Sequence, residues 1–371
     1  MRILEVIGRL GMGGDTGSVL SALEVLINTG RLSVSSVDFL THDIGYNRDA
    51  VLQLSRRGHK VIILNGDMRK SGPLKYYMSV KKALVNNGPY DIVHVHTGMQ
   101  SAIVLKAALS CKVPSRICHA HINSVQRKVN SVANSFLTPV FRYMINRYAT
   151  DRAACGMDAG RFLFGFKTKF RVVKNGIDLR RFGKISTKRI EALREELGIQ
   201  PSRYIIGHVG RFSDMKNQIF ILRLAERLKY NSKFLFVMVG DGENFQKIKD
   251  KAEKLRLNCV FPKRREDIEA FMSMFSLHLV PSLPGEGFSI TMLEAQAAGC
   301  PTICSRHVPR DADMGLGLVE FLPLEDEDKW LDAIKSKTRM RIDPDQCRKI
   351  IMEKGYEIND AAEEWAKLYG T

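Results

Sequence analysis

The sequence predicts an α/β protein made of two Rossmann-like, doubly wound domains that face each other across a cleft. Short β-rich runs alternate with helix-length stretches along the whole chain, which is the order that gives parallel sheets covered on both faces. The strand candidates are near-continuous apolar runs, as expected when both faces of a sheet are buried. The length of 371 residues also exceeds the range that one hydrophobic core usually supports, about 250–300 residues.

The alternation defines the expected elements. Strands are predicted at 2–7, 36–40, 60–64, 91–96, 116–120, 152–155 and 171–173, and then at 204–209, 234–239, 258–261, 277–280, 302–304 and 318–321. Helix-length stretches between the first strands include 16–29, 73–86 and 99–110. The pattern pauses around 165–185, so we place a linker near 166–170. We therefore expect a first domain at 1–168, a second at 169–355, and a final helix at 356–371 that packs back on the first.

Composition excludes several classes of protein. No segment approaches the about 20 consecutive apolar residues that span a bilayer. The apolar start contains Glu5 and is better explained as a buried strand than as a signal peptide. Seven scattered cysteines with no Cys-x-x-Cys pair argue against a disulfide framework or a cysteine zinc site. These features favour a reducing compartment, and we expect a cytoplasmic protein.

Positive charge is concentrated in the first half. The formal net charge is +17, and residues 1–168 hold 22 Lys and Arg against 10 Asp and Glu. A basic half favours a polyanionic partner, which is a membrane surface, a nucleic acid or an anionic polymer. Within it, 124–148 carries a helical apolar stripe with Pro139 inside it. That stripe predicts either a core-facing helix with a solvated basic side or a helix in contact with a membrane surface.

The strongest motif begins at Glu286, directly after the loop that follows the strand at 277–280. Its next residues are Gly287, Phe288, Ser289 and Ile290, and a helix is expected from near Ser289 to Gly299. The free N–H groups of the first turn suit a diphosphate. Glu286 and Glu294, eight residues apart, can then hold hydroxyls at the two ends of one nucleotide-sugar. The competing interpretation is a first-turn charge favoured by the helix dipole and a solvated helix residue.

Two cations follow the strand at 204–209. Arg211 and Lys216 lie on the turn between this strand and the next helix. Cations at the carboxyl end of a strand can neutralise a departing diphosphate without a metal ion. Ordinary surface charge is the alternative. The acidic pair Asp311 and Asp313 lies elsewhere among basic residues, so we interpret it as a solvated loop and expect no metal site.

Weaker signals lie in the first half. Gly13 and Gly14 belong to a glycine-rich turn after the first strand, although their spacing is not a dinucleotide fingerprint. Two strands end in histidine pairs, at 94 and 96 and at 119 and 121. We expect only one member of each pair to face a given side of the sheet, which argues against chelation by either pair. His121, last on its strand, is the best candidate to touch a ligand, and His94 and His119 are expected to be hydrogen-bonded structural residues.

Taken together, these motifs resemble glycosyltransferase family 4, the retaining enzymes of the GT-B fold. The resemblance runs through nearly the whole chain and is most specific over 204–304. The family's paired glutamates match Glu286 and Glu294, and its Arg/Lys pair matches Arg211 and Lys216. Its glycine loop matches Gly13 and Gly14, and its strand-end histidine matches His121. The first half looks like the bacterial members that build capsular polysaccharide or exopolysaccharide.

The resemblance implies a role for each matched residue. Glu294 is expected to hold the ribose and Glu286 the hydroxyls of the transferred sugar, while Arg211 and Lys216 bind the diphosphate. Asp267 is expected near the base, and His121 is expected to position the sugar. The segment 215–217, Met-Lys-Asn, departs from the commoner Lys-Gly and leaves the donor's identity open. No cofactor or metal is implied, and the first domain is implied to face the acceptor.

We therefore expect a retaining, metal-independent glycosyltransferase that moves a sugar from a nucleoside-diphosphate sugar to a hydroxyl of a lipid-linked saccharide. UDP-sugar is the expected donor, and an anionic membrane surface the expected site of peripheral association. A sugar-nucleotide epimerase or hydrolase of the same fold is the alternative within enzymes. A basic nucleic-acid-binding protein is the alternative of another class, but the chain lacks an interleaved stripe of aromatic and basic residues and known binding motifs.

Overall fold

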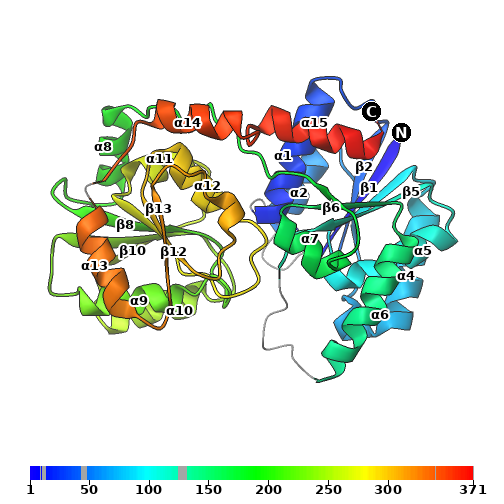
Figure 1. The fold of residues 1–371 in the computed structure, drawn as a ribbon, viewed down its shortest axis with the longest axis horizontal. Coiled ribbons are helices and arrows are strands. Elements are labelled where there is room, and N and C mark those ends of the chain that lie inside the picture. Colours follow the sequence, from blue (N-terminus) through cyan, green and yellow to red (C-terminus); the bar gives the residue numbers. More distant parts are fainter. Residues whose placement is uncertain (9, 11–13, 43–47, 124–131, 339, 371) are drawn as a thin grey trace. The chain divides into compact units, whose positions relative to one another are not determined.

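The computed structural model describes all residues except 9, 11–13, 43–47, 124–131, 339 and 371. Their contacts divide the chain into two compact units. The first unit is Met1–Gly176 with Ile358–Thr371, and the second unit is Ile177–Glu357. Each unit is built on one parallel β-sheet (Figure 1).

Seven parallel strands form the sheet of the first unit, in the order β3-β2-β1-β4-β5-β6-β7. They are β1 (Arg2–Ile7), β2 (Ser36–Thr41), β3 (Val61–Ile63), β4 (Ile92–Val95), β5 (Ser115–Ala120), β6 (Asp151–Ala154) and β7 (Arg171–Val172). The strand order reverses between β1 and β4. In open sheets of this kind, ligands bind outside the carboxyl ends of the strands at that switch point.

Helices cover the strands of the first unit. They are α1 (Gly14–Asn28), α2 (Arg48–Arg56), α3 (Met68–Ser71), α4 (Pro73–Asn87), η2 (Gly98–Gln100), α5 (Ser101–Ser110), α6 (Val132–Tyr148), α7 (Met157–Phe164) and α15 (Ile358–Tyr369). The terminal helix α15 lies beside α1 (Figure 1) and joins it in one core with β1, β2, β4 and β5. Trp365 of α15 is almost fully buried there. Helices α4, α5 and α6 pack side by side.

The second unit repeats this architecture with six strands in the order β10-β9-β8-β11-β12-β13. They are β8 (Tyr204–Val209), β9 (Phe234–Val239), β10 (Cys259–Lys263), β11 (Leu277–Val280), β12 (Thr302–Ser305) and β13 (Val319–Leu322). Every hydrogen-bonded pair is parallel. The switch point lies between β8 and β11.

The helices of the second unit are α8 (Thr187–Glu196), α9 (Gln218–Arg227), α10 (Phe245–Lys254), α11 (Ile268–Met274), α12 (Ile290–Ala297), η4 (Arg310–Ala312), α13 (Glu327–Lys337) and α14 (Pro344–Glu353). Residues of α9 and α13 share one core with β8, β9 and β11. In it, the rings of Phe220 and Trp330 meet edge to face, with centroids 4.9 Å apart. On the other side of the sheet, α11 packs against α8 and α12, and α12 packs against α14.

All thirteen predicted strands are present, with ends shifted by two residues at most. The linker lies later than the expected 166–170, because β7 still pairs with β6 and the first unit runs to Gly176. Gly165, with φ of 93°, ends α7, so the pause in the pattern marks the end of a helix rather than a domain boundary. A β-bridge between Ile177 and Glu357 then joins the two ends of the second unit.

Among the described residues, no helix combines the length and the apolar composition that crossing a bilayer requires. All seven cysteines are free thiols.

Candidate active site

An ion pair lies at the switch point of the second unit. The Nζ of Lys216 donates to Oε1 of Glu286 at 2.5 Å, and both side chains are largely buried. Lys216 comes from the loop after β8 and Glu286 from the loop after β11. Two hydrogen bonds tie these loops together, from Asn217 Nδ2 to the Pro281 carbonyl and from Leu283 N to the Met215 carbonyl. The two charges are therefore held at the sheet edge where ligands of this topology bind.

Buried polar atoms without hydrogen-bond partners surround this pair. Among the described residues, they include Oε2 of Glu286 and the hydroxyls of Ser282, Ser289 and Thr291. Ser289 occupies the N-cap of α12, but its side chain makes no capping hydrogen bond. An unsatisfied buried polar group costs about 1–3 kcal/mol. Several of them beside one helix N-terminus indicate a site whose missing partners are supplied by a polar ligand.

Glu294 lies on α12, one turn further in, and is partly exposed. Loss of hydration raises the pKa of its carboxyl to about 7, and Glu269 adds to this, while Arg181 and Lys216 oppose it. Lys216 is therefore within electrostatic range of Glu294 as well as bonded to Glu286. A carboxyl that titrates near neutral pH beside a cation is typical of functional sites.

The remaining residues of the motif are positioned by packing. The ring of Phe288 stacks on Tyr356 with centroids 5.4 Å apart, so its side chain belongs to the core. Gly287 is buried, and Ile290 is the first residue of α12. Gly285 has a φ of 135°, which is a backbone conformation that favours glycine.

Arg211 does not join the pair formed by Lys216 and Glu286. Its guanidinium lies 2.9 Å from the carboxylate of Glu243, and both side chains are exposed. Glycines are required in the turn that carries Glu243, because a Cβ on Gly240 would lie 2.0 Å from the Gly210 carbonyl oxygen. The structure thus brings three of the four expected donor residues together and gives Arg211 a separate acidic partner.

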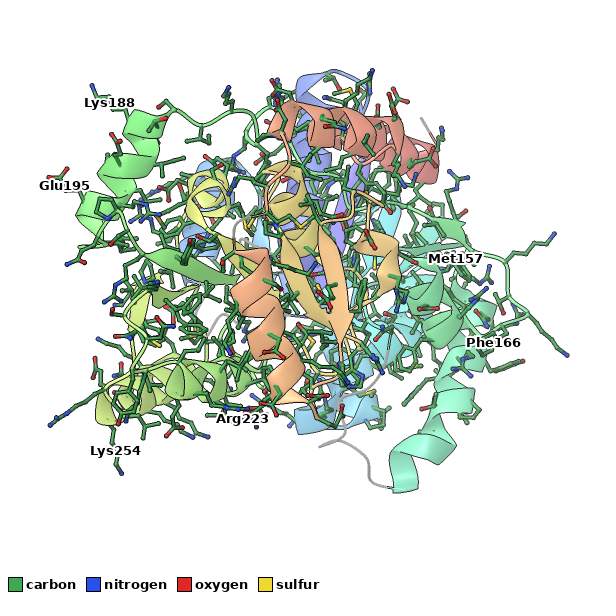
Figure 2. All side chains as sticks on the ribbon, turned by 60° about the vertical axis from the view of Figure 1, so that its left-hand side comes forward. Met157, Phe166, Lys188, Glu195, Arg223 and Lys254 are labelled. Atoms are coloured by element: carbon green, nitrogen blue, oxygen red, sulfur yellow. The ribbon has the colours of Figure 1, made fainter. Side chains whose placement is uncertain are left out.

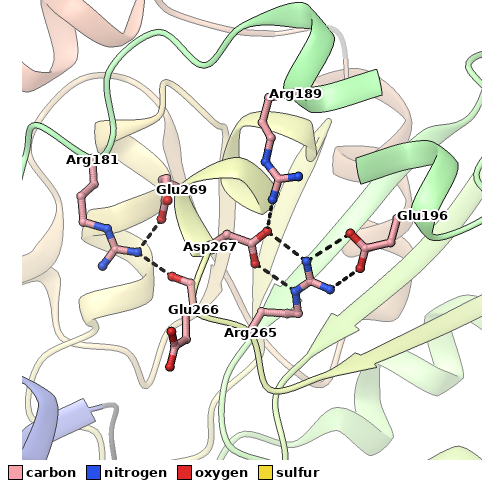
Figure 3. Close-up of polar contacts among 7 residues, drawn as sticks. All are labelled: Arg181, Arg189, Glu196, Arg265, Glu266, Asp267 and Glu269. Atoms are coloured by element: carbon pink, nitrogen blue, oxygen red, sulfur yellow. Dashed lines mark hydrogen bonds and ion pairs between the residues drawn. The ribbon is translucent and has the colours of Figure 1, made fainter. Parts of the chain in front are cut away.

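Asp267 belongs to an ion network on the same unit (Figure 3). Its carboxylate contacts Arg265 at 2.9 Å and Arg189 at 2.5 Å. Hydrogen bonds from Arg265 lower the pKa of Asp267, and Arg265 also contacts Glu196. These charges satisfy one another without a ligand.

Three of the expected site residues, Gly13, Gly14 and His121, belong to the first unit. Gly13 lies outside the described residues, and Gly14 is the first residue of α1. His121 directly follows β5 and is 5% exposed. Its Nε2 lies 2.8 Å from Nδ1 of His96.

The expectation that each histidine pair would place one member on each side of the sheet was wrong. Residues two apart on a strand point to the same face, so all four rings gather on one side. Ring centroids are 4.2 Å apart within the first pair and 4.3 Å within the second. The sequence interpretation also missed Glu5, whose carboxylate contacts His96. A lone acid inside an apolar strand is the signal that could have found it.

Comparison with known proteins identifies the family and the fold. The family model "Glycosyl transferases group 1" matches residues 189–313, which include Lys216, Glu286 and Glu294. A Bacillus subtilis protein named "Putative glycosyltransferase EpsF" is 34% identical to this chain. The match covers 90% of this chain and 86% of that protein. An Escherichia coli protein is 26% identical over 80% of this chain and 79% of its own. It is named UDP-Gal:alpha-D-GlcNAc-diphosphoundecaprenol alpha-1,3-galactosyltransferase.

Solved structures show the same fold. The Anabaena protein Alr3699/HepE, crystallised in complex with UDP-glucose, matches with a TM-score of 0.76 and 19% identity. The match covers 100% of this chain and 99% of HepE. The architecture is the GT-B fold, as the sequence predicted.

Proposed function

This chain belongs to the group 1 glycosyl transferases, and we propose that it transfers a sugar from a UDP-sugar to a hydroxyl of a lipid-linked saccharide. The observation that carries the proposal is the Lys216–Glu286 pair at a switch point, surrounded by buried polar atoms without partners. A sugar offers hydroxyls and a diphosphate offers oxygens, and together they can satisfy these atoms. The likeness to EpsF supports a role in exopolysaccharide synthesis.

The donor fits the second unit in one direction. Lys216 and the N-terminus of α12 present positive charge to the diphosphate, and Arg211 adds a second cation once it exchanges Glu243 for the ligand. Glu286 accepts hydrogen bonds from the transferred sugar, and Glu294 accepts them from the ribose. Gly287, Phe288, Ser289 and Ile290 contribute backbone groups at the same helix end, and we assign Asp267 to the region of the base.

Catalysis in this arrangement is stabilisation of the leaving group. Positive groups fixed where charge develops lower the barrier because they need no reorganisation during the reaction. We assign the carboxylates of the donor site to binding hydroxyl groups, and we propose that the departing phosphate oxygen accepts the proton of the acceptor hydroxyl. This front-face route retains the donor's anomeric configuration and uses no metal. His121, with Gly13 and Gly14, belongs to the first unit and positions the sugar.

This mechanism has a direct test. Transfer should proceed in excess EDTA, and proton NMR of the first-formed product should show the donor's anomeric configuration. Activity lost in EDTA and restored by Mg²⁺ or Mn²⁺ would remove the metal-independent claim, and an inverted anomeric signal would remove the retaining one.

The lipid-linked acceptor and the donor are supported by different relatives. The E. coli relative's name gives UDP-Gal as donor and a diphosphoundecaprenol-linked sugar as acceptor, and HepE was crystallised with UDP-glucose. We propose donors and acceptors of these chemical classes here. The decisive experiment measures UDP release from a panel of UDP-sugars, with and without an undecaprenyl-diphosphate-linked sugar. Acceptor-dependent release supports the proposal, whereas acceptor-independent release or isomerisation would instead indicate the hydrolase or epimerase.

Membrane association is proposed for the first unit. Large apolar side chains are exposed on α4 (Leu74, Met78 and Val85) and on the described part of α6 (Leu137, Val140 and Tyr143). Phe166 is 88% exposed and Met157 is also exposed (Figure 2), and Lys167 and Lys169 follow Phe166 along the chain. Both helices pack on α5, so their apolar side chains flank one helix. We propose that this basic and apolar surface docks on the cytoplasmic leaflet of an anionic membrane.

Flotation with liposomes tests this docking. Each Lys or Arg near an anionic surface contributes roughly 1 kcal/mol, which salt weakens. The full-length protein should float with anionic vesicles and remain behind with neutral ones. Equal binding to anionic and neutral vesicles, or binding to neither kind, would contradict the proposal.

A further inference from the structure

A polar cluster lies inside the core of the first unit. It consists of Glu5 on β1, His94 on β4 and His119 on β5, all fully buried, with His96 beside them. Glu5 is the register partner of His94 across the β1–β4 pair. The same face of the sheet carries the apolar core shared with α1 and α15. A polar cluster in such a place is stable only when its members bond one another or a ligand.

Hydrogen bonds to Glu5 and Tyr369 fix one ring nitrogen of His96 and one ring nitrogen of His94. Nε2 of His96 donates to the carboxylate of Glu5 at 2.8 Å, because an ionised carboxylate only accepts. The hydroxyl of Tyr369 donates to the other carboxylate oxygen at 2.8 Å, and its oxygen accepts from Nδ1 of His94 at 3.0 Å. In both rings, the second nitrogen therefore accepts: Nδ1 of His96 lies 2.8 Å from Nε2 of His121, and Nε2 of His94 lies 3.2 Å from Nδ1 of His119.

The state of Glu5 agrees with this assignment. Burial by itself raises the pKa of Glu5, but His94 and His96 outweigh that effect and bring it below its usual range. Burial lowers the pKa of His96 to about 3 and that of His119 well below its usual value. The carboxylate of Glu5 therefore accepts both hydrogen bonds, and the positions of the ring nitrogens define the site proposed below.

Ring nitrogens of His94, His96 and His119 lie close to one another. Nε2 of His94 and Nδ1 of His119 are 3.2 Å apart. His94, His96 and His119 can each offer one nitrogen such that all three lie within 4.8 Å of one another. Nε2 of His119 is buried without a hydrogen-bond partner among the described residues. Tetrahedral zinc, with Zn–N bonds of about 2.0–2.1 Å, separates its ligand nitrogens by about 3.3–3.4 Å, so the ion would replace the ring-to-ring hydrogen bonds that Nε2 of His94 and Nδ1 of His96 now accept.

We propose that His94, His96 and His119 form a structural Zn²⁺ site in the first unit. Glu5 accepts a hydrogen bond from Nε2 of His96, and Tyr369 accepts one from Nδ1 of His94. Hydrogen bonds of this kind to the second ring nitrogen orient histidines around zinc in proteins. Zinc prefers neutral imidazoles and a tetrahedral geometry. The three nitrogens fill three of the four tetrahedral positions, and Nε2 of His121 would give up its hydrogen bond to Nδ1 of His96 when the ion binds. The ion would join β4 to β5 and, through Tyr369 and Glu5, stabilise α15 on β1.

Metal analysis of the full-length protein tests the site. After growth with added zinc, purification and dialysis, we expect about one zinc per chain. His94→Gln and His119→Gln should lose it, and the matched control His42→Gln should keep it, because His42 is a buried histidine outside the cluster. Glu5→Gln should weaken zinc binding by about 10–100-fold.

A second measurement decides the matter if the histidine variants do not fold. Co²⁺ added to the zinc-free parent should give the intense visible bands of a tetrahedral site, and zinc should abolish them stoichiometrically. Zinc should also raise the parent's unfolding temperature. A folded parent that shows neither cobalt bands nor retained zinc would overturn the proposal and leave a metal-free hydrogen-bonded cluster. So would zinc retained by both histidine variants.

Discussion

The two units share one topology, but their switch points carry opposite chemistry. At the second unit's switch point, the cation Lys216 and the carboxylate Glu286 lie beside buried hydroxyls without partners. Beside the first unit's switch point, histidines lie around one carboxylate, and hydrogen bonds connect nearly the whole cluster. A switch point by itself therefore only provides a location for a ligand. The charge and the unsatisfied atoms placed there decide whether it favours a charged ligand.

The comparison also separates two ways of burying a carboxylate. Glu5 is stabilised by donors within its own unit, and its pKa lies below the usual range. For Glu294, lost hydration outweighs the nearby cations Arg181 and Lys216 and raises its pKa to about 7. The first carboxylate is therefore a structural group, and the second is a group that gains from a ligand hydroxyl. Four predictions test this contrast.

The largest effect is expected for Lys216→Ala. Losing one fixed donor to developing charge costs about 2.7–4 kcal/mol, or about 10²–10³-fold in kcat. Donor kinetics of the variant should show this loss, while the matched control Lys247→Ala, an exposed lysine of α10, should behave like the parent. If Lys216→Ala and Glu294→Ala both stay within about twofold of the parent in kcat/KM, these residues do not form the donor site.

The next effect is on stability and belongs to the first unit. Glu5→Gln replaces an acceptor of two hydrogen bonds with a side chain that turns an NH₂ group toward His96 or Tyr369, so one donor loses its acceptor. Hydrogen bonds to charged groups contribute about 1.5–3 kcal/mol, and we expect a loss of about 2 kcal/mol in chelator, where no metal contributes.

Hydrogen exchange localises this loss. Protection should fall in β1, β4, β5 and α15 and remain unchanged in β8 and β9. The exposed control Glu24→Gln should leave all of these elements unchanged. Loss of protection in both units would contradict the assignment of Glu5 to a cluster within the first unit.

Periodicity was enough to predict the sheets. Runs such as 234–239 are apolar because both faces of the sheet are covered, and every predicted strand is present. Local signals were less reliable where two causes give one pattern. The glycine at 165 ends a helix and does not mark a linker, because β7 follows it and completes the first sheet.

The candidate site was predictable only in part. Lys216 and Glu286 could be inferred because each follows a strand that borders the switch point. The pairing of Arg211 with Glu243, and of Asp267 with two arginines, depends on tertiary contacts between distant segments. Glu5 was missed because its partners, His96 and Tyr369, lie 91 and 364 residues away along the chain.

A smaller effect is expected from the titration of Glu294. Its pKa is raised from 4.5 to about 7, so the stability it contributes is fully present below pH 4.5 and is lost as the pH rises through about 7. Because the side chain is partly exposed, we expect a change of about 1 kcal/mol. Urea unfolding between pH 5 and 8 should show this decline in the parent relative to Glu294→Gln. The exposed control Glu195→Gln, whose side chain points into solvent (Figure 2), should not alter the slope. Identical slopes in the parent and Glu294→Gln would contradict the raised pKa.

The smallest effect is expected for Arg189→Ala, in the network of Figure 3. Arg189 is 44% exposed, and exposed ion pairs contribute only about 0.2–1 kcal/mol. Asp267 also keeps Arg265 as a partner, so its carboxylate stays paired after the substitution. We expect a stability loss near 0.5 kcal/mol at most, an approximate figure for exposed pairs, and a donor KM within about twofold of the parent. Arg265→Ala should cost more stability, because it leaves both Glu196 and Asp267 without this guanidinium.

Arg189 and Lys216 are both cations paired with a carboxylate, so they differ mainly in their surroundings. Lys216 lies beside buried polar atoms without partners, whereas the charges around Arg189 are paired with one another and partly exposed to solvent. A loss of kcat/KM for Arg189→Ala as large as that for Lys216→Ala would show that the ligand reaches this network and would break the distinction.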